Sequence, residues 1–213
     1  MKFGNKLTLG LSALALAGAA HANGVVFTEG FDDFVKSGWI QTNLSSPVGK
    51  SWSQGIGDAS YAAQSGAETS YAQATYLSAD LGSGSIDNWL ISPVISLGGS
   101  TVLSFYARTE DVAGFADSFS VLFSAGSGSA TSGFTTILAS VTASTADWTQ
   151  YTVTLPSAAT GRIAFEYLVA DANNANSLGI DTVSVSAVPE PATYGLMAMG
   201  LAGLAMLRRR KAS

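Results

Sequence analysis

Alternation of apolar and polar residues with a period of two restricts the fold of this chain more than any other feature of its sequence. The alternating segments lie at residues 103–107, 118–124, 150–155 and 162–169. Such a segment forms a strand with one face in a core and the other in water, whereas no helical period of useful length runs between residues 24 and 186. Turn-forming segments separate the strands, at residues 98–99, 126–128, 158–161 and 171–176. The pattern predicts an all-β fold, an antiparallel β-sandwich of the jelly-roll type.

Residues 1–22 have the three parts of a secretory signal peptide. Lys2 and Lys6 supply the positive start, residues 7–19 form a short apolar run, and Ala20-His21-Ala22 fits the small-x-small cleavage rule. The apolar run is short for a membrane span, so an uncleaved anchor is the weaker alternative. Cleavage after Ala22 would remove the one histidine of a chain that has no cysteine.

A mature domain without histidine or cysteine lacks most catalytic constellations. Ser-His-Asp and Cys-His mechanisms, disulfides and zinc sites built on His or Cys are excluded. Carboxylate chemistry survives, but the chain has no Glu-x-Asp-x-x-Glu strand motif, which is common in glycosidases built on jelly rolls. The adjacent acids Glu110 and Asp111 follow a strand and are predicted to lie in a solvated loop. We therefore expect no enzymatic activity, with a carboxylate-dependent carbohydrate-active enzyme as the alternative.

Residues 188–213 end the chain with a short motif, an apolar stretch and a basic cluster. The apolar stretch at 192–207 would form a helix about 24 Å long, at the short end for crossing a bilayer, and is the predicted single transmembrane helix. The basic tail at 208–213 would stay in the cytoplasm, which places the rest of the chain outside the inner membrane. Composition alone also permits a plain tail anchor.

The order of these parts resembles the PEP-CTERM sorting signal of Gram-negative bacteria, with its motif at Val188, Pro189, Glu190 and Pro191. The resemblance implies that a membrane transpeptidase of the exosortase type recognises the tail and removes the helix near the motif. Proteins with such tails are usually exported to the cell surface or to an exopolysaccharide matrix. The expected path is a precursor anchored in the inner membrane and then delivery to the surface or matrix.

The net charge of the middle segment, residues 23–187, limits the classes of partner that it can bind. Four bases and 14 acids lie between residues 23 and 189, a net charge of −10 against −5 for the whole chain. Nucleic acids need a basic face, so none is expected as a partner. A divalent cation is the more plausible charged partner.

Motifs along the middle segment resemble the choice-of-anchor J domain, which is related to the cleaved-adhesin and MAM-like β-sandwiches. They lie at residues 29–32, 38–39, 87–95, 103–108, 117–121, 148 and 178–183. Their order covers nearly the whole segment and implies a jelly-roll sandwich used in binding or adhesion, without implying a reaction. The family often has a second acid where this chain has Thr182.

Two acids alternate in step with the apolar residues of the first and last predicted strands, so their side chains are expected on the apolar face. Glu29 is in step with Phe27, and Asp181 is in step with Val183. A buried carboxylate needs a cation or several hydrogen bonds, and the first and last strands of a jelly roll are often neighbours. Glu29, Asp181 and Asp32 could therefore hold a structural Ca²⁺ together with backbone carbonyls. In the alternative, the acids reach water at strand ends or accept hydrogen bonds from backbone amides.

Residues 45–76 combine aromatic rings with hydrogen-bonding side chains, as a carbohydrate site does. The candidate ligand-binding residues are Trp52, Gln54, Asp58 and Tyr61, with Gln64, Tyr71 and Tyr76 in the same segment. In the alternative, the segment is a long loop whose aromatic rings pack on the sheet. For any one of these residues, this alternative is the favoured interpretation. The remaining tryptophans, Trp39, Trp89 and Trp148, are expected in the core.

The sequence thus predicts an exported, non-catalytic binding or adhesion sandwich that an exosortase-type system sorts and that is linked to exopolysaccharide or biofilm. Extracellular polysaccharide is the expected partner, besides a transient contact of the C-terminal helix with the inner membrane. The carbohydrate-active enzyme and a purely structural matrix protein without a discrete ligand are the alternatives.

Overall fold

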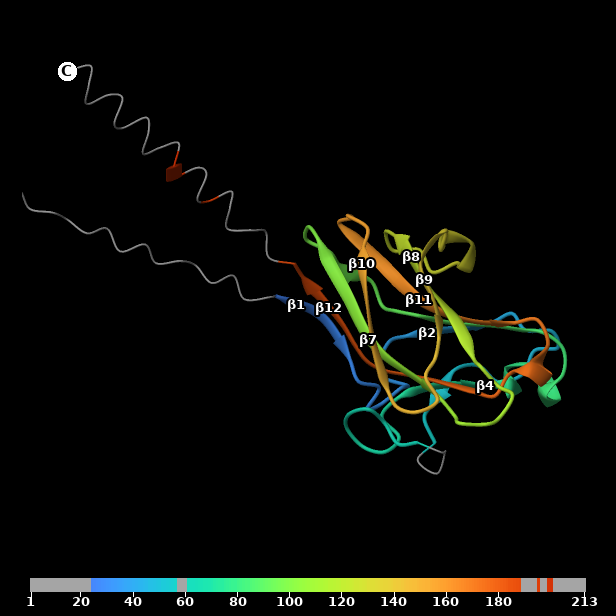
Figure 1. Ribbon diagram of the computed structural model, residues 1–213. Coiled ribbons are helices and arrows are strands. Elements are labelled where there is room, and N and C mark those ends of the chain that lie inside the picture. Colours follow the sequence, from blue (N-terminus) through green and yellow to red (C-terminus); the bar gives the residue numbers. More distant parts are fainter. Residues whose placement is uncertain (1–23, 57–60, 189–194, 196–198, 201–213) are drawn as a thin grey trace, which may run out of the picture.

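The computed structural model describes residues 24–56 and 61–188, together with residues 195, 199 and 200 (Figure 1). One sheet, sheet A, contains β1 (Val25–Glu29), β3 (Ser53–Gln54), β4 (Ala72–Thr75), β7 (Thr101–Thr109), β10 (Thr149–Leu155) and β12 (Ser177–Ala187). The other, sheet B, contains β2 (Ile40–Asn43), β5 (Ile86–Ile91), β6 (Ile95–Ser96), β8 (Ser118–Ala125), β9 (Thr136–Thr142) and β11 (Thr160–Val169). Short 3₁₀ helices lie at η1 (Tyr76–Ser78), η2 (Asp80–Gly82), η3 (Thr131–Gly133) and η4 (Ala172–Asn174).

The two sheets form the predicted antiparallel sandwich. The strand order is β10-β7-β12-β4-β3 in sheet A, where β1 also pairs with β12, and β2-β5-β11-β8-β9 in sheet B, where β6 also pairs with β11. Every pairing is antiparallel. Most consecutive strands lie in opposite sheets, so the chain crosses repeatedly from one layer of the sandwich to the other.

The core between the sheets follows the predicted alternation. Leu103, Phe105 and Ala107 of β7 are fully buried, and their neighbours along the strand are partly exposed. The ring of Phe165 on β11 meets that of Phe105 at a centroid distance of 5.0 Å, in an edge-to-face contact that joins the two sheets. Trp39 stacks on Phe165, as expected of a core residue. Trp89 is also buried, in a smaller cluster with Ile91, Leu122, Phe134 and Ala164.

Strand β12 changes its partner at an irregular step in its middle. It pairs with β4 over Ser177–Ile180 and with β1 over Val183–Ser186. The register against β7 shifts between Asp181 and Ser184, and Thr182 has a φ of +47°, which non-glycine residues rarely adopt. This bulge places Asp181 where β1, β4 and β12 meet.

Several sequence predictions concern residues that the structure does not describe. The signal peptide at 1–22 and most of the transmembrane stretch at 192–207 lie outside the described residues, as do Pro189, Glu190 and Pro191 of the sorting motif. Among the residues that are described, no helix is long and apolar enough to cross a membrane.

Candidate functional site

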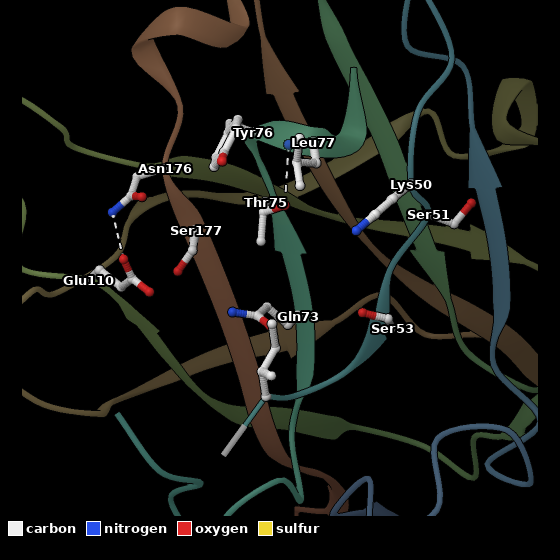
Figure 2. Close-up of a pocket in the computed structure, with 11 residues that line it drawn as sticks. Lys50, Ser51, Ser53, Gln73, Thr75, Tyr76, Leu77, Glu110, Asn176 and Ser177 are labelled. Atoms are coloured by element: carbon white, nitrogen blue, oxygen red, sulfur yellow. Dashed lines mark hydrogen bonds between the residues drawn. The ribbon is translucent and has the colours of Figure 1, made fainter. Parts of the chain in front are cut away.

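A cleft of about 370 Å³ opens on the outer face of sheet A (Figure 2). Its polar lining consists of Lys50, Ser51, Ser53, Gln73, Thr75, Glu110, Asn176 and Ser177. Its apolar lining consists of Ile56, Tyr76 and Leu77. These residues come from β3, β4 and β12, from the segments on either side of β3, and from the segments that follow β4, follow β7 and precede β12. The cleft therefore depends on strand pairings between distant parts of the chain.

Strand parity explains why polar side chains gather there. Ser53 pairs with Gln73, and Thr75 pairs with Ser177, so these four side chains project from one face of sheet A. The residues that alternate with them, Trp52, Ala72, Ala74 and Leu178, pack in the core.

Gln73 on β4 is a buried polar residue of the cleft. Its side chain lines the cavity although the residue is only 3 % exposed. Within the part of the chain that the structure describes, no hydrogen bond reaches its carboxamide. Among the described residues, the buried side-chain nitrogen and oxygen atoms that lack a partner belong to Trp39, Asn88, Thr101 and Arg108, so the polar atoms of the Gln73 carboxamide are open to the cleft. The Gln73 carboxamide is therefore available to form hydrogen bonds with a group that enters the cleft.

The wall beside Gln73 is held by a buried carboxylate. Asn176 donates its side-chain N–H to Glu110 Oε2 at 3.3 Å and its backbone N–H to Asp117 Oδ1 at 3.0 Å. Asp117, 2 % exposed, also accepts hydrogen bonds from the hydroxyls of Thr109, at 2.8 Å, and Tyr167. Burial and the neighbouring carboxylate raise the pKa of Tyr167, which keeps it a donor. The core thus fixes the backbone that presents Asn176.

The rim of the cleft carries an exposed aromatic ring and a cation. Tyr76 on η1 is 43 % exposed, and its backbone N–H donates to Asn176 O at 2.9 Å. Ile56 is 54 % exposed beside it. The ammonium group of Lys50 forms no ion pair with any residue that the structure describes. An exposed ring next to fixed hydrogen-bonding groups is the arrangement that binds sugars.

Three of the four sequence-predicted ligand residues, Trp52, Gln54 and Tyr61, do not line this cleft. Trp52 is 2 % exposed and donates its indole N–H to Asn88 O at 3.1 Å. Gln54 donates to Phe31 O at 2.7 Å and accepts from Phe34 N at 2.8 Å. Asp58 lies outside the described residues. The aromatic residue of this segment that lines the cleft is Tyr76, and Ser51 and Ser53 line it on either side of Trp52.

Tyr61 belongs to an aromatic cluster that covers β12. It is 4 % exposed, its ring lies 5.5 Å from that of Trp148, and its hydroxyl is 3.3 Å from Ser177 Oγ. Gly179 makes this cover possible, because a Cβ there would lie 2.8 Å from the Trp148 ring. Trp148 is half-buried in this cover and donates to Ala62 O at 2.8 Å, so the prediction that it lies in the core was wrong. Its strand context did not reveal that it faces the outer side of the sheet.

Glu29 and Asp32 line a separate cavity of about 230 Å³ beside β12. As predicted, the first and last strands of the domain are neighbours, with Glu29 opposite Val183. Glu29 Oε1 accepts from Phe31 N at 2.7 Å, and burial together with the charge of Asp32 raises the pKa of Glu29. Asp32 Oδ1 accepts from Ser70 Oγ at 2.8 Å. Two of the three expected calcium ligands therefore share one cavity.

Asp181 lies behind this cavity and faces backbone amides. It is fully buried, and its Oδ2 accepts from Gln64 N at 2.8 Å and from Ser65 N at 3.1 Å. Its Oδ1 accepts from Thr182 N at 2.5 Å. Burial nevertheless raises the pKa of Asp181 to about 6. Among the described residues, no group of three or more acidic side chains is arranged to hold a metal ion.

Comparisons with known proteins agree with both resemblances in the sequence. The model of the Cleaved Adhesin Domain matches residues 25–185, and that of the PEP-CTERM protein-sorting motif matches residues 187–211. No match was found among curated protein sequences.

Solved structures with the same fold include the K3 and K1 cleaved adhesin domains of Lys-gingipain from Porphyromonas gingivalis W83. Each has a TM-score of 0.63 and 23 % identity; the alignments cover 78 % and 76 % of this chain and 99 % and 98 % of those domains. The CBM22-1 xylan-binding domain of Xyn10C from Paenibacillus barcinonensis has a TM-score of 0.51 and 14 % identity, over 81 % of this chain and 99 % of that domain. At these identities the likeness shows the fold alone.

Proposed function

The chain belongs to the Cleaved Adhesin Domain family, and we propose that it is a non-catalytic module that binds a polysaccharide in the cleft on the outer face of sheet A. The sorting motif and the adhesin domain indicate an exported cell-surface protein. The observation that carries the proposal is the carboxamide of Gln73, which lines the cleft without a partner among the described residues, beside the exposed ring of Tyr76. Such a site serves a ligand that has both apolar faces and hydrogen-bonding groups.

The chemistry of the cleft matches that of a sugar ring. A pyranose has C–H faces that pack on an aromatic ring and hydroxyls that need donors and acceptors. Tyr76 and Leu77 offer apolar surface, and the surrounding amides and hydroxyls offer hydrogen bonds. The similarly folded Xyn10C domain is a xylan-binding domain, which adds support for this class of ligand.

The cleft has a single acidic residue among the described residues that line it, which favours binding over hydrolysis. A glycosidase needs two carboxyl groups that face each other across the bond to be cut, about 5–10 Å apart. Among the described residues that line the cleft, Glu110 is the one acid, and it accepts a hydrogen bond from Asn176. Sugar release that a single acid substitution abolishes would favour the alternative of a carbohydrate-active enzyme.

A glycan array probed with the full-length protein tests the proposal. We expect binding to at least one extracellular polysaccharide without release of reducing sugar. Tyr76→Ala should weaken binding about fivefold, because stacking on an aromatic ring contributes about 1 kcal/mol. Leu168→Ala is the control, since Leu168 is similarly exposed (58 %) but lies on sheet B. Absence of any glycan signal, or equal binding by Tyr76→Ala, would contradict the proposal and favour a purely structural matrix protein.

The sorting route extends this proposal beyond the folded domain. An exosortase-type transpeptidase recognises the motif that begins at Val188, after the stretch at 192–207 has held the precursor in the inner membrane. The processed protein then reaches the surface or the extracellular matrix, where a polysaccharide-binding module would contribute to a biofilm. The match of the sorting-motif model over residues 187–211 supports this route.

Structural calcium is a separate proposal. Glu29 and Asp32, which line one cavity with Ser65 and Gly66, would hold the ion together with backbone oxygens. Calcium prefers carboxylate and carbonyl oxygens, and the raised pKa of Glu29 fits a carboxyl that lacks a cation. Asp181 would support the site from behind through its hydrogen bonds to Ser65 and Thr182. Calcium-dependent melting of the protein tests the assignment.

A further inference from the structure

The floor of the cleft carries a neutral group rather than a charged one. The Gln73 carboxamide can both donate and accept hydrogen bonds, and no described residue pairs with it. Gln73 lies on β4 between β3 and β12, so its side chain projects from the sheet and not from an edge. A group that enters the cleft therefore meets a neutral amide that can both donate and accept a hydrogen bond.

The charges around Gln73 disfavour a charged sugar. Lys50 precedes β3 and Glu110 follows β7, so they lie on opposite sides of the cleft, with Gln73 between them (Figure 2). A single charge on the ligand would be attracted to one of them and repelled by the other. The domain's net charge of −10 also disfavours a polyanionic glycan. A neutral polar substituent suits the space above Gln73.

The apolar lining provides room for a methyl group. Ile56 and Leu77 border the same cleft as Gln73, and Ile56 is more than half exposed. An unsubstituted sugar whose ring packs on Tyr76 and Leu77 would leave the exposed Ile56 without an apolar partner. A substituent that joins a neutral amide to a methyl group would use both kinds of surface.

We propose that the cleft recognises an acetamido group, so that its ligand is a glycan of N-acetylated amino sugars; this rests on the proposed function. The N–H and C=O of a trans amide point in opposite directions, so the group needs partners on two sides. Gln73 supplies one side, and the carboxylate of Glu110 or the hydroxyl of Ser177 supplies the other. The acetyl methyl group packs against Ile56 and Leu77.

Calorimetric titration of the full-length protein with two trisaccharides tests this inference. Tri-N-acetylchitotriose and cellotriose share a β-1,4-linked backbone and differ only in the substituent at C2. We expect the acetylated sugar to bind at least about tenfold more tightly, because a site that hydrogen-bonds an N–H discriminates strongly against an analogue without it. This comparison needs no variant, so it does not depend on the folding of a mutant.

Variants then show which residue is responsible for the preference for the acetylated trisaccharide. Gln73→Met, which keeps the length of the side chain and removes its amide, should abolish the preference, whereas Gln150→Met, at an exposed position of β10, should keep it. Equal or tighter binding of cellotriose, with both sugars lost in Tyr76→Ala, would overturn the inference and leave the proposed function standing. Tighter binding of the deacetylated amine trimer would also overturn it. Binding of no glycan at all would overturn both.

Discussion

At the scale of single residues, Asp181 is a carboxylate that the fold buries without a cation. It holds the backbone of Gln64 and Ser65 against the bulge of β12, yet burial raises its pKa to about 6. A carboxyl with a higher pKa in the folded than in the unfolded state binds protons more readily when folded, so stability falls as the pH rises from about 4 to 6.

This effect predicts a pH dependence that one substitution removes. In chelator, the free energy of unfolding of the wild type should fall by up to about 3 kcal/mol between pH 4 and pH 6.5 through Asp181, because each pKa unit corresponds to about 1.4 kcal/mol. Asp181→Asn should flatten this dependence, whereas Asp111→Asn, at an exposed position, should not. Urea unfolding across this pH range measures it, and parallel curves for the wild type and Asp181→Asn would contradict the prediction.

The residues of the cleft were harder to predict than the residues of the core. Gln73 alternates with Ala72 and Ala74, and this parity was a signal that its side chain leaves the core. Trp52 packs in the core, which agrees with the alternative favoured for this segment, but its face could not be predicted from alternation because the strand after it, β3, has only two residues. From the sequence, Glu110 is a loop residue after β7, and nothing in the sequence places it near Asn176. The pairing of β7 with β12 brings the two residues together.

At the scale of elements, the pairing of β1 with β12 could be anticipated from the sequence, but the bulge at Thr182 could not. In the expected jelly roll the first and last strands lie side by side. The pairing of β1 with β12 then places Glu29 opposite Val183. The bulge depends on where β4 ends and β1 begins along one edge of β12, which is a long-range property of the sheet.

A calcium ion at Glu29 and Asp32 would tie the end of β1 to β12. We expect millimolar calcium to raise the melting temperature, because an ion at 100 times its dissociation constant stabilises the folded state by about 2.7 kcal/mol. Glu29→Gln should lose most of this gain. Asp33→Asn should keep it, since Asp33 pairs with Lys36 at the surface, at 2.6 Å. An identical melting temperature of the wild type in calcium and in chelator would refute the site.

At the scale of the whole molecule, the sorting tail and the folded domain have opposite charges. The domain from residue 23 to 189 carries −10, while residues 208–211 are all basic. Processing near the motif would therefore release a strongly acidic protein, which mutual repulsion keeps apart from its own copies.

Mass spectrometry of the C-terminus tests this processing. We expect the surface form of the wild type to lack residues 208–213 and the double variant Pro189→Ala, Pro191→Ala to retain them in the membrane fraction, because it lacks the motif for the transpeptidase. Ser186→Ala, just before the motif, is the control and should be processed normally. A mature wild-type protein that still carries the basic tail would contradict the prediction.

Strand β12 connects the cleft directly to the sorting motif. It begins at Ser177 in the cleft and ends at Ala187, next to Val188 and the sorting motif, with β7 on one side and β4 and β1 on the other (Figure 1). A pull between a bound polymer and an anchored tail would run along β12 and load its hydrogen bonds in shear, many at once, instead of peeling them apart in sequence. The strand that forms the floor of the binding site would then also be the tether that bears the load.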